Sequence, residues 1–227
     1  MTGAEAVAQI QQGIGWRSDL ATEILATLNF AQDEVEKPGM TLPEFLKTEA
    51  LVTASDGNQE IPVSSNFIKE VEFKSGALRY QGTATSRTFF LEKMSRMDAE
   101  KYFYGDWRGT FDPQVDSDIV QSGIPRAYVL YQSVIRIYPI PDQDYTLQWS
   151  YYQHDSDIEN SATTNNWLTY HPWLIVGGAG WKIASDIQNQ AAMQKFAQLR
   201  MDASRALIAS VVEREIAGRR FALGSRL

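Results

Sequence analysis

The sequence predicts an α+β fold, in which a helical bundle formed by the N- and C-terminal segments accompanies a central antiparallel β domain. Three observations lead to this prediction. Residues 18–35 carry apolar side chains at helical spacing, and residues 172–216 do so again. Between them, residues 50–152 contain short runs rich in Val, Ile, Thr, Phe and Tyr, separated by turn-forming residues.

The first predicted element is a helix from Ala4 to about Val35, in two pieces. The break falls at Gly13 and Gly15, because glycine inside a helix costs about 1 kcal/mol relative to alanine. Ser18 is a suitable N-cap for the second piece. Residues 38–39, Pro-Gly, then prevent the helix from continuing. The apolar stripe of the second piece consists of Leu20, Ile24, Leu25, Leu28 and Val35.

The middle of the chain has the pattern of antiparallel hairpins. The clearest pair is residues 128–131 and 134–138, which flank a tight turn. Residues 145–152 form the returning strand, with alternate aromatic and apolar side chains on one face. Good helix formers at 94–104 predict a short helical insertion, followed by a polar loop over 112–123.

The last element is a long helix that begins at Pro172, a residue suited to the first turn, and reaches about Ile216, with a possible break near 189–190. Polar residues before it, such as Asn165, are loop and cap residues. Gly177 and Gly180 occupy helix positions that favour alanine, so we expect another backbone to pack tightly against them. The predicted domains are a helical part (1–50), a β region with a helical insertion (51–160), and a long helix with an extended arm that packs with 1–50 (161–227).

The amino-acid composition excludes several classes of functional site. The 227 residues include no cysteine, which excludes disulfide scaffolds, zinc–thiolate sites and thiol nucleophiles, and only two histidines, His154 and His171. A net charge of −7 provides no basic footprint for gripping DNA. The N-terminus lacks a signal-peptide pattern and no apolar run is long enough to span a bilayer, so we expect synthesis in the cytoplasm and no membrane partner. Six Trp, ten Tyr and ten Phe instead favour cores and protein interfaces.

The glycine-rich run at 176–182 differs from a phosphate-binding loop. Such a loop needs glycine directly before the lysine and Ser or Thr after it, whereas Trp181 precedes Lys182 and Ile183 follows. We therefore expect no nucleotide cofactor here, and interpret the glycines as a helix-packing surface.

Carboxylates and histidines supply few catalytic candidates. Asp116/Asp118, Asp142/Asp144 and Asp155/Asp157 lack the glycine and terminal glutamate of a calcium loop, and are interpreted as solvated turn residues. His154, beside Asp155, and His171, before Pro172, have no partner motif and are interpreted as polar boundary residues. The sequence thus predicts no metal site, no cofactor and no enzyme; a hydrolase using an unmarked Ser or Thr is a lesser alternative.

The C-terminal arm combines arginines with apolar anchors. Two interpretations stay open: a frayed, solvated end, or an arm that docks into an acidic groove on a partner. The candidate interface residues are Arg214, Arg219, Arg220, Phe221, Leu223, Arg226 and Leu227.

Several short motifs occur together in a recognisable order in the second half of the chain. They are Gly-Ile-Pro-Arg-Ala-Tyr (123–128), Ile-Arg-Ile-Tyr-Pro-Ile-Pro (135–141), Tyr-Thr-Leu (145–147), Tyr-Tyr (151–152) and Asn-Asn-Trp-Leu (165–168) before Pro172. In the first half, a helical hairpin and the Leu-Pro-Glu-Phe-Leu anchor (42–46) fit the same plan, while residues 52–90 match no pattern. With these motifs in this order, the chain resembles the head-to-tail connector (adaptor, head completion) proteins of tailed bacteriophages.

The resemblance implies a non-enzymatic virion component at the head–tail junction. Such a protein would self-associate in a ring, of twelve copies, that joins the portal protein to a tail protein of the nozzle or tail tube. DNA would pass through the lumen during genome ejection without sequence-specific binding, and the segment 214–227 would extend towards the portal. The alternative is an aromatic-rich β binding module of a phage tail that holds glycans.

Overall fold

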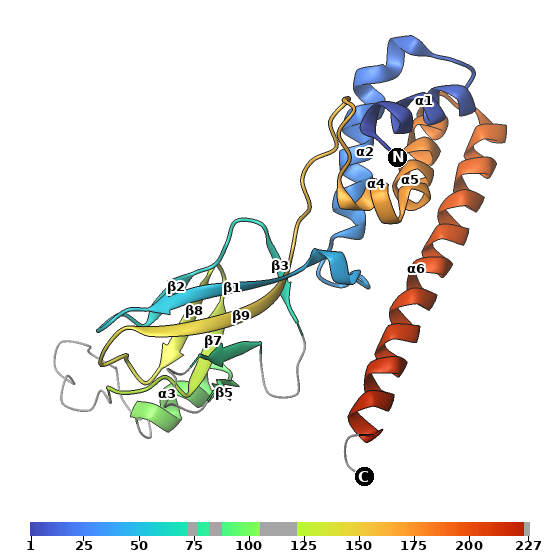
Figure 1. The fold of residues 1–227 in the computed structure, drawn as a ribbon. Coiled ribbons are helices and arrows are strands. Elements are labelled where there is room, and N and C mark those ends of the chain that lie inside the picture. The colour runs from blue at the N-terminus through green and yellow to red at the C-terminus, as the bar shows by residue number, and fades with distance from the viewer. Residues whose placement is uncertain (72–76, 82–87, 105–121, 225–227) are drawn as a thin grey trace. The chain divides into compact units, whose positions relative to one another are not determined.

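The computed structural model describes residues 1–71, 77–81, 88–104 and 122–224, the part from 214 to 224 as backbone alone (Figure 1). The chain divides into two compact units. The helical unit combines Met1–Leu46 with His154–Leu227, and the β unit is Lys47–Gln153. N-terminal helices pack with C-terminal helices, and the strands form mainly antiparallel sheets, which confirms the predicted α+β class.

The N-terminal helices break where the glycines predict. Helix α1 (Gly3–Gly13) starts with a capping box, in which the Glu5 amide donates to Thr2 Oγ1 and the Thr2 amide to the Glu5 carboxylate. Helix α2 (Ala21–Val35) follows a 3₁₀ turn, η1 (Ser18–Leu20). The predicted Ser18 N-cap is wrong: the residue before α2 is Leu20, which makes no side-chain cap. Instead of a side-chain cap, the 3₁₀ turn leads directly into α2, and the Ala21 amide donates to the Ser18 carbonyl.

Three helices form the C-terminal part of the helical unit. They are α4 (Asn166–Tyr170), α5 (Pro172–Asp186) and α6 (Gln190–Gly224), so the predicted break near 189–190 is confirmed. The predicted end near Ile216 is wrong, because the α6 backbone stays helical through Gly224. One glycine, Gly218, costs only about 1 kcal/mol, and the good helix formers around it outweigh that.

Asn165 caps α4 and also ties the unit together. Its Oδ1 accepts from the Leu168 amide at 2.9 Å, while its Nδ2 donates to Gln32 Oε1 at 2.8 Å and to the Ser156 carbonyl at 3.0 Å. The side chain is 7% exposed, so truncation leaves buried groups unpaired. Asn165→Ala should therefore lower the free energy of unfolding by about 1–3 kcal/mol in urea denaturation. Asn166→Ala is the matched control, because it removes only an exposed hydrogen bond to Asp155. Equal losses in the two variants would contradict the prediction.

Within its described residues, the β unit contains two sheets and one helix. Its elements are β1 (Lys47–Ala54), β2 (Glu60–Pro62), β3 (Phe67–Glu70), β4 (Leu78–Tyr80), β5 (Phe89–Phe90), β6 (Glu92–Lys93), α3 (Arg96–Tyr104), β7 (Ala127–Tyr131), β8 (Val134–Tyr138) and β9 (Tyr145–Gln153), and a 3₁₀ turn, η2 (Glu44–Leu46), precedes them in the helical unit. The hairpin at 128–138, the returning strand and the short helix are confirmed. The polar loop predicted over 112–123, with Asp112, Asp116 and Asp118, lies outside the described residues through position 121.

Strand β9 organises the first sheet. It pairs antiparallel with β1 from Lys47↔Tyr152 to Ala54↔Tyr145, and with β3 and β4 as its other neighbours; β5 pairs with β4. The second sheet has the order β2-β8-β7-β6. One pair departs from the predicted antiparallel arrangement: β6 and β7 are parallel, and the chain between them includes α3, because parallel neighbours need a crossover connection.

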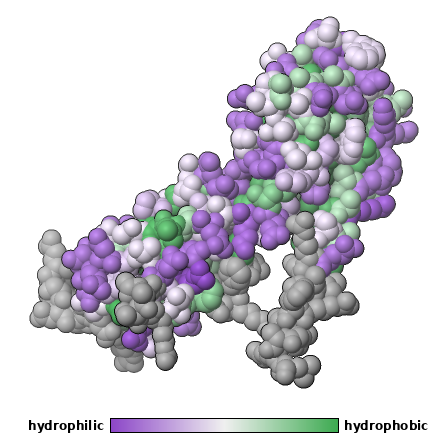
Figure 2. Space-filling view, viewed as in Figure 1, coloured by the Kyte–Doolittle hydropathy of each residue, from purple (hydrophilic) through white to green (hydrophobic). Residues whose placement is uncertain are grey.

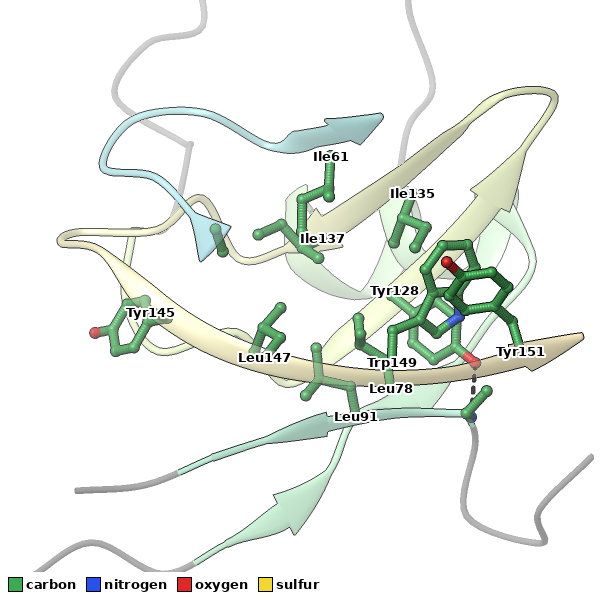
Figure 3. Close-up of a cluster of buried hydrophobic side chains, with 12 residues drawn as sticks. Ile61, Leu78, Leu91, Tyr128, Ile135, Ile137, Tyr145, Leu147, Trp149 and Tyr151 are labelled. Atoms are coloured by element: carbon green, nitrogen blue, oxygen red, sulfur yellow. Dashed lines mark hydrogen bonds between the residues drawn. The ribbon is translucent and has the colours of Figure 1, made fainter. Parts of the chain in front are cut away.

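The two sheets bury a shared apolar core (Figure 3). Trp149 is 1% exposed and its ring lies 5.1 Å from that of Phe67 and 4.3 Å from that of Tyr151. Tyr128 is fully buried, and its hydroxyl accepts from the Ala77 amide at 3.0 Å. Burial, assisted by the charge of Glu70, raises the pKa of Tyr128, so the phenol remains neutral. The aromatic face predicted along β9 is thus core.

Candidate interaction surface

Close packing of α5 against α6 depends on the glycine run. A Cβ on Gly177 would lie 2.7 Å from the backbone nitrogen of Arg200, and one on Gly180 would lie 2.5 Å from the ring of Phe196. The expected backbone approach is confirmed at Gly177; at Gly180 the close neighbour is an aromatic side chain. Gly177, Gly178 and Gly180 lie inside α5 and are buried. Their amides belong to the hydrogen-bonded backbone of the helix, and their missing side chains allow close packing.

These contacts also fix the register of the two helices. Phe196 faces Gly180 and Arg200 faces Gly177, so α5 and α6 run antiparallel. Helix α6 has 35 residues and α5 has 15, or about 52 Å against about 22 Å. The same register brings α6 past the first residue of α5 at about residue 205. Beyond that point α6 extends past the other helices of its unit (Figure 1); we call residues 208–224 the α6 overhang.

Apolar side chains are exposed along this helix. Met201 is 46% exposed, Ile208 51% and Val212 47%. Their spacing of seven and four residues places them on one face, which we call the α6 stripe. Leu207, at 6%, is the last buried side chain among the described residues of α6. Figure 2 shows hydrophobic areas (green) on the surface of the helical unit, among mainly hydrophilic ones (purple).

Five of the seven predicted interface residues, from Arg214 to Leu223, belong to the α6 overhang. The backbone of 214–224 continues α6, so the arm begins as helix and not as extended chain. Their side chains, and all of Arg226 and Leu227, lie outside what the structure describes. The assignment of Arg214, Arg219, Arg220, Phe221, Leu223, Arg226 and Leu227 to an interface therefore stays a prediction.

A second feature of the helical unit is a buried carboxylate directly after α2. Glu36 is 1% exposed. Its Oε1 accepts from Trp167 Nε1 and from the Asp155 amide at 3.3 Å, and its Oε2 lies 2.7 Å from His154 Nδ1. Burial raises the pKa of Glu36, and hydrogen bonds from Trp167, His154 and the Asp155 amide oppose that rise. His154, predicted to be a polar boundary residue with no partner motif, contacts this carboxylate.

Sequence reasoning missed Glu36. The two residues of the pair are 118 positions apart, and no local motif joins them. One signal was present: Glu36 follows Leu28 by eight residues, which places a carboxylate on the apolar face of the helix. A charged residue at such a position needs buried partners.

The raised pKa of Glu36 gives a pH-dependent prediction. A carboxyl whose pKa is higher in the folded state stabilises the fold fully below its unfolded pKa, and loses that contribution as the pH rises through the folded pKa. Glu36→Gln removes this titration. The unfolding free energy of the wild type relative to Glu36→Gln should therefore be highest near about pH 4 and decrease towards about pH 7. Urea denaturation in metal-free buffer measures this, and a relative stability that rises with pH would contradict it.

The remaining candidates have structural partners. Asp142 accepts from the Tyr145 hydroxyl, and Asp144 accepts from the Asp56 amide at 3.0 Å, so this pair holds turns of the β unit. Asp155 accepts from the Asn166 amide at 2.7 Å, at the start of α4. His171 joins α4 to α5, and its ring lies 6.0 Å from that of Phe45. No helix among the described residues is long and apolar enough to cross a membrane.

The chain is similar to a known family over nearly its whole length. No curated protein matches the chain. A family model described as SU10 adaptor protein matches residues 1–222, which covers both units and most of α6. The resemblance to phage adaptors is thereby confirmed and extends into the first half of the chain, where residues 52–90 fitted no pattern. The chain belongs to the SU10 adaptor protein family, a family of phage head–tail adaptors.

Proposed function

We propose that this adaptor is a ring-forming virion protein that joins the portal to the tail, and that the end of α6 docks on the portal. A tail protein of the nozzle or tail tube would bind the opposite side of the ring. Family membership supports the adaptor role. The single observation that supports the docking element is the α6 overhang with its exposed apolar face.

A helix that packs against nothing is only marginally stable in water, which favours a binding partner for the α6 overhang. Most helix stability in proteins comes from packing an apolar face against another element. In the register of the two helices, α5 has no residues left to pack against α6 beyond about residue 205. Ile208 and Val212 are half-exposed on that part of the helix. A groove on another protein would bury them, which is a common mode of helix recognition.

The charge distribution of the chain also supports docking of the α6 end on the portal. The whole chain carries −7, yet four of its last fourteen residues are arginines, at 214, 219, 220 and 226. Arginines interleaved with Phe221 and Leu223 suit an acidic groove with apolar pockets. The acidic remainder of the chain would repel DNA phosphates, which suits a lumen that passes DNA without holding it.

Charge reversal at the end of α6 tests this proposal. Arg219→Glu with Arg220→Glu should weaken binding to the portal at least about tenfold, as when charged pairs at an interface become repulsive. The matched control is Lys195→Glu with Arg205→Glu, two exposed reversals on the same helix outside the overhang. Binding is measured by co-sedimentation with portal rings. Equal binding by both double variants would show that the end of α6 is not the docking element.

The glycan-binding alternative receives no support from the aromatic strand β9. Its aromatics Tyr145, Trp149 and Tyr151 are between 1% and 6% exposed in the core. Glycan stacking requires exposed rings. We therefore propose no second function, and tryptophan fluorescence unchanged by host polysaccharide is the expected result.

A further inference from the structure

We propose that Asp33, Glu36 and His154 bind one divalent transition-metal ion of the zinc class. One carboxylate oxygen from each acid and one ring nitrogen lie within 4.8 Å of one another. Asp33 and Glu36 are three residues apart and so lie on the same side of α2 and its C-terminal end. His154 directly follows β9 at the point where the chain re-enters the helical unit.

The hydrogen bonds around Glu36 orient it as a ligand. Trp167 Nε1 and the Asp155 amide both donate to Oε1, which leaves Oε2 directed towards His154. Metal-binding carboxylates and imidazoles are commonly held by such outer hydrogen bonds, which fix the orientation of the ligand. The orientation is therefore set before any ion arrives.

The charge balance of the site also favours a cation. A carboxylate that is 1% exposed lacks hydration, and burial raises its pKa. The partner that its Oε2 contacts is an imidazole, which carries charge only when protonated. A divalent ion would compensate both Glu36 and Asp33, whereas Asp155 is already engaged by the amide and side chain of Asn166.

Small side-chain movements would complete the coordination. Ligand atoms around tetrahedral zinc are about 3.3 Å apart, so the 2.7 Å separation of His154 Nδ1 and Glu36 Oε2 would widen and Asp33 would move inward. Asp33 is exposed and the His154 side chain is 41% exposed, so both can move and the ion has a route from solvent. Nδ1 must then offer its lone pair, with the ring proton on Nε2 or released to water.

The ligand set indicates the class of ion. One imidazole with two carboxylates suits Zn²⁺ and related transition metals, whereas Mg²⁺ prefers six oxygen ligands and retains its waters. A bound ion would cross-link the end of α2 to the segment at 154, two parts of the helical unit far apart in sequence. Its expected effect is therefore stabilisation of that unit.

Titration of the full-length chain with Zn²⁺ tests the site. Calorimetry should give one ion per chain, and saturating Zn²⁺ should raise the melting temperature by several degrees, while equal Mg²⁺ leaves it unchanged. Asp33→Asn, Glu36→Gln and His154→Gln should each weaken Zn²⁺ binding at least about tenfold. Asp33→Asn is decisive, because an exposed position cannot abolish binding through misfolding.

Two controls separate this site from adventitious binding. Glu23→Gln changes an exposed carboxylate of the same helix, and His171→Gln removes the only other histidine; both should bind Zn²⁺ as the wild type does. The proposal is overturned if the wild type shows no one-to-one binding, or if Asp33→Asn and His154→Gln bind with wild-type affinity.

Discussion

Trp149→Ala is expected to lower the unfolding free energy of the β unit by about 3–5 kcal/mol, the usual cost of removing a buried tryptophan. The side chain is 1% exposed and lies in the apolar core that the two sheets share (Figure 3). Its ring packs against those of Phe67 and Tyr151. Its removal leaves a cavity that the surrounding sheet cannot fully close. Urea denaturation followed by far-UV circular dichroism measures the loss.

Two controls define the cause. Trp181→Ala, at a position that is 41% exposed, should change stability by no more than about 0.5 kcal/mol. Trp149→Phe should recover much of the loss, because it keeps an aromatic ring and removes an indole N–H that has no hydrogen-bond partner within the described residues. Equal losses for Trp149→Ala and Trp181→Ala would refute the assignment of Trp149 to the core.

Gly177→Ala is expected to destabilise the helical unit by about 1–3 kcal/mol. In an exposed helix the same change would stabilise by about 1 kcal/mol, because alanine is the better helix former. Here the new Cβ would lie 2.7 Å from the backbone nitrogen of Arg200 and 3.0 Å from its Cα, so a backbone has to move. The clash outweighs the gain in propensity.

The expected result is a lower denaturation midpoint and weaker anchoring of α6. Gly39→Ala is the matched control, since a Cβ there meets nothing within 4 Å and the stability should hardly change. A Gly177→Ala variant as stable as the wild type, or more so, would show that α5 and α6 can separate freely. It would then remove the register from which the α6 overhang is derived.

Local sequence predicted the fold where local chemistry determines it. Glycines ended α1, a proline began α5, and a two-residue turn set the β7–β8 hairpin, as predicted. The predictions at Ser18 and Ile216 are wrong because local propensity competes with backbone hydrogen bonding. A 3₁₀ turn takes the place of the Ser18 cap, and good helix formers continue α6 past Gly218. The parallel β6–β7 pair depends on long-range packing, which no local pattern encodes.

The candidate sites also differ in whether local sequence predicts them. The glycine run was correctly predicted to be a packing surface, since its spacing contradicts a phosphate loop. The partners of Glu36 come from residues 118 to 131 positions away, so only the fold brings them together. The exposed stripe of α6 could not be separated from its buried face by periodicity, because apolar residues occur on both faces.

The most direct test of the central claim is to mix the full-length chain with its portal and record native mass spectra. An adaptor that joins portal and tail should form a large cyclic complex with one defined number of copies, twelve if the ring matches a twelve-membered portal. A chain that remains a free monomer beside intact portal rings would contradict the account.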